Sequence, residues 1–210
     1  MTKHNTQGTT KHLQSYLVAK GFSQAEGISY EETFAPVARL DSLHLLLAIA
    51  AHFDLDVHHI DIKSAYLNGD LDKEIYMDQP KGFMVPGKKN LVCLLKKAIY
   101  SLKQAGQQWH IHLHGTLEEL GFQKNIASDV SIFIKCYNGG DPLIILVYID
   151  DLAIFGTLED IKSFKTHIST CYKVTDLGEV SQFLGLHIAR DHPKKILTID
   201  QSHYIQRMLM

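Results

Sequence analysis

Residues 143–156 read LIILVYIDDLAIFG, and this stretch decides the fold. Two apolar runs, rich in the branched residues of buried strands, flank the acidic pair Asp150-Asp151. Strands this close in sequence pair as an antiparallel hairpin. We therefore expect a β-hairpin that emerges from the core with both aspartates at its tip.

The segments next to this hairpin extend it into an α+β domain. SIFIK at 131–135 predicts a further strand, which the turn-forming residues 138–142 separate from the hairpin. Thr157 with Asp160 resembles a capping box, which predicts a helix start. The buried face of that helix would carry Ile161, Phe164 and Ile168.

Further elements are predicted on both sides. Upstream, Asp41 is placed to cap a helix over 42–53, and 57–62 (VHHIDI) has the pattern of a strand. A helix is predicted over 104–120, with Gly121 placed to end it. The HIHLH segment within it alternates apolar and polar residues, as a strand would. Short strands follow in 182–190 and 195–199, and Ser202 is placed to cap a last helix. Because that helix is cut off at Met210, we expect a fragment of a longer protein.

Composition excludes several classes of protein. The chain has 210 residues, is 45% hydrophobic and has a net charge of −2, so it can bury a core and is not a uniformly basic nucleic-acid coat protein. Its longest apolar runs, 45–51 and 143–149, fall far short of the about 20 residues of a membrane span. No signal-peptide pattern opens the chain, and its three cysteines have no metal or disulfide spacing. We expect an intracellular protein, cytoplasmic or nuclear, that is not secreted.

Charge is distributed unevenly along the chain. Residues 81–117 contain six lysines and no acid, whereas 54–78 contain seven acids against Lys63 and Lys73. These runs can be solvated faces of neighbouring elements. They can equally be a basic wall for a polyanion beside a carboxylate cluster for divalent ions. Charge alone leaves both interpretations open.

The acidic pair has a more specific interpretation. An isolated pair of aspartates is usually a solvated turn, but Asp150 and Asp151 lie at the tip of a buried hairpin. Asp61 lies at the end of another predicted strand. Carboxylates from separate strand ends can form a divalent-metal site for phosphoryl chemistry, because the cation offsets their mutual repulsion. We therefore expect Asp61, Asp150 and Asp151 to converge on one metal site.

Two other patterns carry less weight. Residues 82–89, GFMVPGKK, lack the final hydroxyl of a phosphate-binding loop, and Pro86 removes a backbone donor. The 13 histidines include adjacent and alternating pairs that point in different directions, which favours surface or packed histidines over metal ligands. An unrelated magnesium-dependent phosphohydrolase would need its own phosphate-binding signature, and we find none.

Several segments in fixed order carry a family resemblance. They are LVAKGFSQ (17–24), ETFAPVARLDSLHLLLAIAA (32–51), HHIDIKSAYLNGDLDKEIYMDQPKGF (58–83), VCLLKKAIYSLKQAGQQW (92–109), LVYIDDLAIFG (146–156), DLGEVSQFLGLHI (176–188) and the closing YIQRML. With these segments the chain resembles the reverse transcriptase domain of copia-type LTR retrotransposons over nearly its whole length.

The resemblance implies the right-hand polymerase fold in one α+β domain, with an antiparallel palm sheet, packed helices and a missing or incomplete thumb. Residues 1–53 and about 71–108 would be mostly fingers. Residues 54–70 and about 109–200 would be mostly palm, and 201–210 would begin the next helix. The RNase H, integrase and protease regions of a full Pol polyprotein would be absent.

The resemblance also implies roles for individual residues. Asp61, Asp150 and Asp151 would be the catalytic carboxylates holding two Mg²⁺ or Mn²⁺ ions, with Asp61 and Asp150 the more direct ligands. Tyr66 would exclude ribonucleotides from beneath the sugar, although packing in the palm is an equal alternative. The remaining nucleotide-binding residues would be Gln104 and Tyr148. The nucleic-acid-binding residues would be Lys96, Lys97, Lys103, Leu184 and Gly185.

The implied activity is RNA-directed DNA polymerisation, a nucleotidyl transfer from dNTPs onto a primer paired with an RNA or DNA template. The chain departs from the family pattern at Gln14, Tyr16 and Gln107, where basic residues are expected. These losses favour the alternative of a catalytically silent, decayed or domesticated remnant that only binds nucleic acid.

Overall fold

The structure is a computed structural model that describes residues 2–4, 10–13, 17–124, 129–136 and 140–209. The chain divides into two compact units. Unit 1 comprises residues 1–34 and 66–112, and unit 2 comprises residues 35–65 and 113–210. Gln14, Tyr16 and part of the predicted turn at 138–142 lie outside the described residues. Because Asp61, Asp150 and Asp151 all belong to unit 2, its sheet is the frame of the candidate site.

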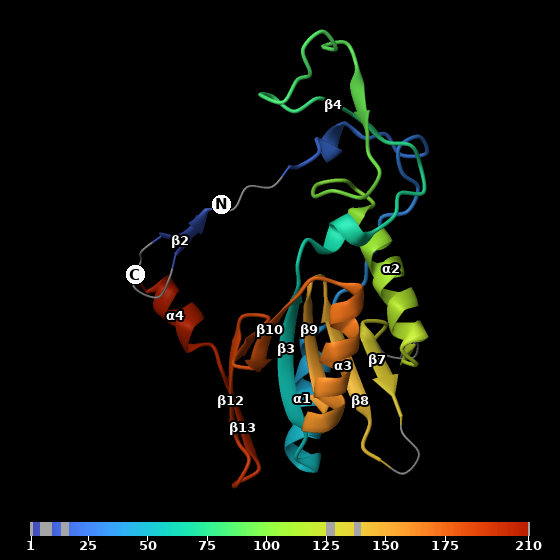
Figure 1. The fold of residues 1–210 in the computed structure, drawn as a ribbon. Coiled ribbons are helices and arrows are strands. Elements are labelled where there is room, and N and C mark those ends of the chain that lie inside the picture. The colour runs from blue at the N-terminus through green and yellow to red at the C-terminus, as the bar shows by residue number, and fades with distance from the viewer. Residues whose placement is uncertain (1, 5–9, 14–16, 125–128, 137–139, 210) are drawn as a thin grey trace. The chain divides into compact units, whose positions relative to one another are not determined.

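A six-stranded antiparallel sheet forms the centre of unit 2 (Figure 1). In spatial order its strands are β10 (Val174–Glu179), β3 (Asp56–Ile62), β9 (Asp151–Gly156), β8 (Leu143–Tyr148), β7 (Ile132–Lys135) and β6 (Gln123–Lys124). The predicted hairpin is β8–β9, in the middle of the sheet. Its apolar runs are continuous because these strands are covered on both faces, so the side chains of either face are buried.

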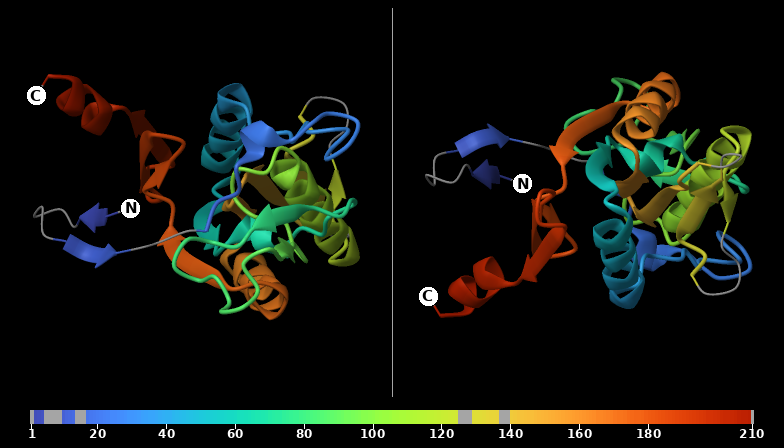
Figure 2. Two further views of the ribbon diagram at one scale, coloured as in Figure 1. Left: turned by 90° about the horizontal axis from the view of Figure 1, so that it is seen from above. Right: turned by 90° about the horizontal axis from the view of Figure 1, so that it is seen from below.

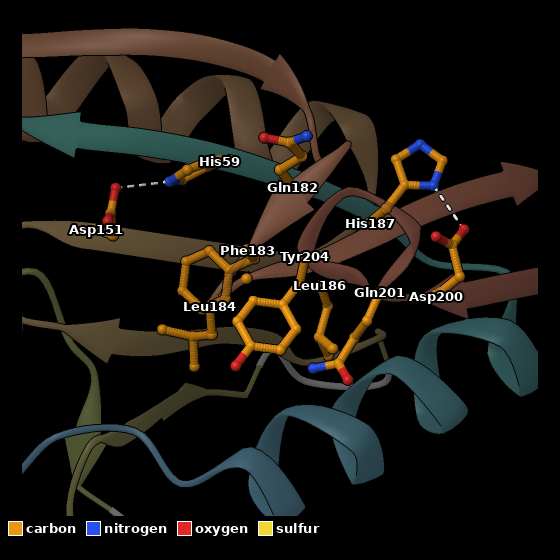
Figure 3. A pocket seen from close by; sticks show the side chains of 11 residues that line it. His59, Asp151, Gln182, Phe183, Leu184, Leu186, His187, Asp200, Gln201 and Tyr204 are labelled. Carbon is orange, nitrogen blue, oxygen red and sulfur yellow. Dashed lines mark hydrogen bonds and ion pairs between the residues drawn. The ribbon is translucent and has the colours of Figure 1, made fainter. Parts of the chain in front are cut away.

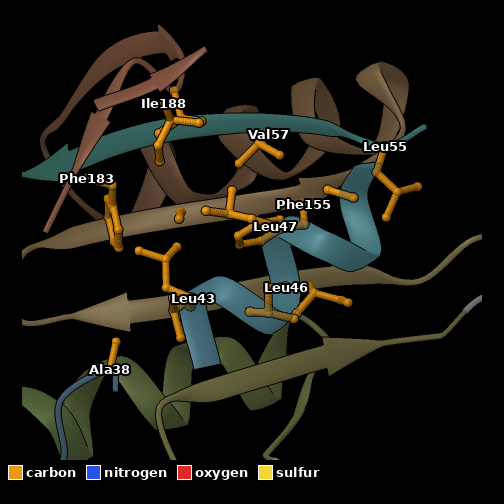
Figure 4. Packing of buried hydrophobic residues seen from close by; sticks show 14 of the residues in the cluster. Ala38, Leu43, Leu46, Leu47, Leu55, Val57, Phe155, Phe183 and Ile188 are labelled. Atoms are coloured by element: carbon orange, nitrogen blue, oxygen red, sulfur yellow. The ribbon is translucent and has the colours of Figure 1, made fainter. Parts of the chain in front are cut away.

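Helices cover the two faces of this sheet. Figure 2 separates α1 (Leu40–Phe53) and α3 (Leu158–Cys171) onto opposite sides. Leu43 and Leu47 of α1 pack in one core with Val57 of β3 and Phe155 of β9 (Figure 4). On the other side, α3 buries Ile161, Phe164 and Ile168, as predicted. The α+β class with an antiparallel sheet is therefore confirmed.

The N-terminal ends of α1 and α3 are stabilised differently. The capping box of α3 is confirmed, because the Thr157 hydroxyl accepts a hydrogen bond from the Asp160 backbone N–H and donates one to the Asp160 carboxylate. The predicted cap of α1 is wrong. That helix begins at Leu40, so Asp41 lies within its first turn and does not occupy the capping position.

A buried carboxylate from another part of the chain takes the place of the α1 cap. Asp129 Oδ2 accepts hydrogen bonds from the Arg39 N–H and the Ser42 hydroxyl, and Asp129 is 5% exposed. Asp129 Oδ1 accepts two more from the backbone and hydroxyl of Ser131. Burial raises the pKa of this carboxyl, but the hydrogen bonds outweigh burial and leave the pKa below its ordinary value. The sequence pattern missed this cap because Asp129 is 90 positions from Arg39.

Helix α2 (Ala105–Glu119) settles the ambiguity of the HIHLH segment in favour of a helix. It crosses the boundary between the two units. Gly121 follows it with φ +87°, and the N–H groups of Gly121 and Phe122 bond the carbonyls of Glu118 and Leu117. This pattern is a Schellman motif, which needs a left-handed residue at the helix end, so the predicted stop at Gly121 is confirmed.

A smaller sheet completes unit 2. It consists of β11 (Gln182–Phe183), β12 (Leu186–Asp191) and β13 (Ile196–Asp200), followed by α4 (Ser202–Met208). The short strands predicted in 182–190 correspond to β11 and most of β12, with a turn at Leu184-Gly185 between them. The predicted cap at Ser202 is wrong: Ser202 is the first helical residue, and its hydroxyl donates to Asp200 Oδ1 of the preceding strand.

Unit 1 contains little regular structure. Its strands are β1 (Thr2–His4), β2 (Thr10–Leu13), β4 (Tyr76–Asp78) and β5 (Val92–Leu94), with the short helices η1 (Gly21–Ser23) and, at the unit boundary, η2 (Ala65–Asn68). The segment 17–24 packs closely on the backbone at Tyr100, where the Ala19 N–H bonds the Tyr100 carbonyl. A Cβ on Gly21 would lie 1.7 Å from the Ser101 carbonyl oxygen, so only glycine fits there.

Candidate active site

Asp61 and Asp151 are brought together by strand register. They lie directly opposite each other where β3 pairs with β9. Residues opposite each other on antiparallel strands project from the same face of the sheet, with Cβ atoms about 4.5–5.5 Å apart. Next to them, the Ile62 N–H donates to the Asp150 carbonyl oxygen at 2.8 Å. The three candidate carboxylates therefore occupy one end of the sheet.

Asp150 belongs to a two-residue turn between β8 and β9. Tyr148 and Asp151 flank the turn as a pair, which leaves Ile149 and Asp150 in the loop. Ile149 has φ +58°, and positive φ at the first loop position alone is typical of a type II′ turn. A β-branched residue is unfavourable there, where glycine is usual. Backbone strain of this kind is often found at functional sites.

Basic side chains from the β3 segment contact two of the carboxylates. Lys63 Nζ lies 2.6 Å from Asp61 Oδ1, and His59 Nε2 lies 2.8 Å from Asp151 Oδ1. Each contact offsets part of the repulsion between the facing carboxylates. Among the described residues, no group of three or more His, Cys, Asp or Glu side chains is arranged as a metal site.

The electrostatics of Asp150 test whether a divalent cation suits this end of the sheet. Burial raises the pKa of the Asp150 carboxyl above its ordinary value, and the charges of Asp151 and Asp61 raise it further. A hydrogen bond within Asp150 and the Lys63 ammonium act in the opposite direction. Neighbouring carboxylates whose charges raise the pKa of Asp150, and which offer hard oxygen ligands, suit Mg²⁺ or Mn²⁺. The donor set therefore fits these ions.

A pocket of about 250 Å³ adjoins Asp151 (Figure 3). His59 and Asp151 line it from the main sheet, and Leu184, Gly185 and Tyr204 line it from the smaller sheet and α4. Both Leu184 and Gly185 have positive φ, +49° and +80°, in the two-residue turn between Phe183 and Leu186. A type I′ turn needs such angles and favours Asn-Gly, so a leucine at this position is strained.

The expected nucleotide-binding residues fall in different units. Tyr148 is in unit 2, half-buried beside the α1 core. Tyr66 is in unit 1, where its ring packs edge-on against Tyr100 at 4.9 Å between centroids. Gln104 is also in unit 1 and is 1% exposed. Its amide bonds the Gln24 side chain and the Ser29 carbonyl, each at 3.0 Å, so it holds the 24–29 loop in place.

The expected nucleic-acid-binding lysines are all exposed residues of unit 1. Lys97 Nζ bonds Asp70 Oδ1 at 2.6 Å and the Asn68 carbonyl at 3.2 Å. Among the described residues, neither Lys96 nor Lys103 forms such an ion pair. The three lysines therefore differ in how much charge they offer to a phosphate backbone.

Sequence reasoning missed one residue of the site. The sequence pattern favours a surface or packed histidine at His59. In the structure its side chain is largely buried and also contacts a candidate catalytic carboxylate. Strand periodicity contained the signal: His59 and Asp61 are two positions apart on β3 and therefore share a face. Periodicity could not show that Asp151 of β9 lies beside them on the same face.

Comparisons with known proteins show which family the chain resembles. The profile of the family described as reverse transcriptase (RNA-dependent DNA polymerase) matches residues 1–210. The chain is 40% identical over 194 residues to the retrovirus-related Pol polyprotein from transposon TNT 1-94 of Nicotiana tabacum, covering 92% of this chain and 14% of the relative. It is 35% identical over 189 residues to the Pol polyprotein from transposon RE1 of Arabidopsis thaliana, covering 90% of this chain and 13% of the relative.

A putative transposon Ty5-1 protein of Saccharomyces cerevisiae is 32% identical over 149 residues, or 70% of this chain and 47% of that protein. No solved structure matches the chain significantly. The chain thus spans about one seventh of the two plant polyproteins. Within the described residues, no helix is long and apolar enough to cross a membrane.

Proposed function

The chain belongs to the reverse transcriptase (RNA-dependent DNA polymerase) family, and from this premise we propose that it is the fingers-and-palm part of a copia-type retrotransposon polymerase. The reaction is RNA-directed transfer of a nucleotide from a dNTP to a primer. The observation that carries the proposal is the register of β3 and β9, because it places Asp61 opposite Asp151 and beside the Asp150 turn.

Asp61 and Asp150 are the proposed ligands of two divalent ions. When bound at this end of the sheet, Mg²⁺ or Mn²⁺ would supply Lewis-acid chemistry, lowering the pKa of a primer 3′-hydroxyl and offsetting the charge of the leaving pyrophosphate. The chain's own contribution is to hold the carboxylates on adjacent strands, so that little reorganisation accompanies the reaction. Asp151 adds negative charge beside them and is itself held by His59.

We assign unit 2 to the palm and unit 1 to the fingers, and no part of the chain to a complete thumb. The sequence-based expectation placed residues 1–53 mostly with the fingers, whereas α1 packs on the main sheet within unit 2. In the proposal α1 therefore belongs to the palm. Its leucines support the face of the sheet that also carries Asp61 and Asp151.

The substrates are a primer–template duplex and a dNTP. Leu184 and Gly185 are proposed to contact the primer end, because their turn lines the pocket beside Asp151. Lys96, Lys97 and Lys103 are proposed to contact phosphates. Tyr66, Gln104 and Tyr148 are each proposed as nucleotide-binding residues on the strength of the family resemblance, with Gln104 acting from within the core of unit 1.

A catalytically silent, nucleic-acid-binding remnant is the second candidate. Two observations favour it: Asp61 and Asp151 are already hydrogen-bonded to Lys63 and His59, and Gln107 supplies no positive charge where the family pattern has a basic residue. A remnant would bind primer–template with the same salt dependence but incorporate no nucleotide.

Single-nucleotide incorporation on poly(rA)/oligo(dT) separates the two candidates. The protein is used in excess over primer, with Mg²⁺ or Mn²⁺, so that weak duplex binding does not limit the signal. We expect template-dependent dTMP addition that Asp61→Asn and Asp150→Asn each reduce by about 10²-fold or more. Asp141→Asn is the matched control, because Asp141 is exposed and precedes the other end of β8. Binding without incorporation would favour the silent remnant.

A further inference from the structure

His59 connects two hairpins of unit 2. Its Nε2 atom lies 2.8 Å from Asp151 Oδ1 at the start of β9 (Figure 3). Its ring packs edge-on against Phe183 at 5.2 Å between centroids, immediately before the Leu184-Gly185 turn. The His59 side chain is 14% exposed and Phe183 is buried. The ring is therefore fixed from two sides.

The direction of the hydrogen bond follows from chemistry. A carboxylate oxygen only accepts, so the His59 Nε2 atom must carry the hydrogen. The bond occupies Asp151 Oδ1, and the Phe183 contact keeps the donor pointed at it. Asp61 is bonded to a different kind of partner. Lys63 is an exposed side chain on a flexible stem, so a cation can readily displace it. The two facing carboxylates are thus held with unequal firmness.

We propose that His59 is a positioning residue that holds Asp151 back from divalent ions, leaving Asp61 and Asp150 as the direct ligands. The inference rests on the proposed polymerase function and adds to it a residue outside the three carboxylates. The affinity of oxygen-ligand sites rises with the number of charged ligands. Releasing Asp151 would therefore add a third carboxylate and tighten metal binding.

The test is a Mn²⁺ titration, followed by electron paramagnetic resonance, of a set of variants of this chain. His59→Phe keeps an aromatic ring against Phe183 and removes the donor. His59→Gln keeps a donor. His58→Gln is the matched control, since His58 is the adjacent histidine on the opposite face of β3, where it contacts Lys165. Thermal melts verify that each variant folds.

We expect His59→Phe to bind Mn²⁺ about 3- to 30-fold more tightly, within the range of couplings between contacting side chains. His59→Gln and His58→Gln should stay near the parent. Adding Asp151→Asn to His59→Phe should remove the gain. Unchanged affinity in a folded His59→Phe variant, or a gain that survives Asp151→Asn, would overturn the proposal.

A second measurement needs no change at His59. Asp151→Asn alone should weaken Mn²⁺ binding much less than Asp150→Asn does, because Asp151 contributes its charge but is not a direct ligand. It should also shift the ¹⁵N resonance of His59 Nε2 through loss of the charged acceptor. A loss of affinity as large as that of Asp150→Asn would contradict the inference. Nucleotide incorporation that depends on Asp61 and Asp150 would still support the polymerase, so the two proposals fail separately.

Discussion

Asp61 and Asp151 face each other across β3 and β9, and each is hydrogen-bonded to a basic side chain of the β3 segment. Like charges opposite each other destabilise a sheet. Lys63 and His59 reduce this cost, but Asp150 in the adjoining turn still has a raised pKa. This end of the sheet is therefore less stable than a neutral one would be, which is common at functional sites.

The first prediction concerns the stability cost of Asp150. The pKa of Asp150 is raised in the folded state, so ionising this carboxyl destabilises the fold. The cost grows as pH rises from the unfolded pKa of about 3.9 to the folded pKa. Asp150→Asn should raise the urea midpoint at pH 7 and leave it nearly unchanged near pH 3.5, where the parent carboxyl is protonated. Asp141→Asn is the control for the loss of one exposed negative charge. A lower midpoint for Asp150→Asn at pH 7 would contradict this interpretation.

The second prediction concerns the long-range cap of α1. The folded pKa of Asp129 is lowered, so its contribution is present above about pH 4 and is lost as pH falls through the folded pKa. Asp129→Asn should lower the free energy of unfolding by about 1–3 kcal/mol at pH 7 and by less near pH 3. Asp41→Asn, in the first turn of the same helix, should cost about 0.3–1 kcal/mol. Equal losses measured by urea unfolding would refute the assigned cap.

A third prediction separates stability from binding at Leu184. Asparagine suits the first position of a type I′ turn, so Leu184→Asn should keep or raise the melting temperature despite losing an apolar contact. Affinity for primer–template, measured by fluorescence anisotropy, should fall. Leu177→Asn, at an exposed leucine of β10, serves as the control and should leave affinity unchanged. Full binding by a stable Leu184→Asn variant would argue against a primer contact.

The fourth prediction distinguishes the three lysines. Each phosphate contact contributes about 0.9 to the slope of log affinity against log salt on B-DNA. Lys96→Ala and Lys103→Ala should each reduce this slope by about 1. Lys97→Ala should reduce it less, because its ammonium is paired with Asp70. Binding isotherms at several salt concentrations measure the slopes, and three equal reductions would show that the Asp70 pair opens on binding.

The fifth prediction concerns sugar selection by Tyr66. Tyr66→Ala should raise the ratio of ribonucleotide to deoxyribonucleotide incorporation if the ring lies beneath the sugar. Tyr100→Ala is the matched control, because it removes the other ring of the same edge-on pair. Packing alone predicts that both variants lose stability and that neither changes the ratio. Incorporation of single nucleotides by the two variants decides between these roles.

Much of unit 2 was predictable from the sequence because its signals are local. The β8–β9 hairpin follows from two branched apolar runs around the acidic pair, although the turn itself is Ile149-Asp150 and Asp151 begins β9. The helix α3 follows from Thr157 and Asp160, which cap it within one turn. Gly121 marks the end of α2 because only a left-handed residue completes the terminal hydrogen bonds. In each case the interacting groups are a few residues apart.

The ordered motifs also determined the family, and with it the three carboxylates to examine. They could not show how those carboxylates are held. Sequence alone did not predict β10 as the neighbour of β3, nor the cap of α1 by Asp129. Asp41 satisfies the local capping pattern, but the helix begins one residue before it, and Asp129 bonds the N-terminal end of the helix.

Only the tertiary structure decided that Asp61 lies opposite Asp151, and that His59 reaches Asp151 while packing on Phe183. Local propensity specifies that β3 is a strand and which residues share its face. Register depends on burying Val57 and Phe155 against α1, contacts between segments about 100 positions apart. A shift of one residue would turn Asp61 toward the opposite face, so the geometry of this site is set by the packing of the whole sheet.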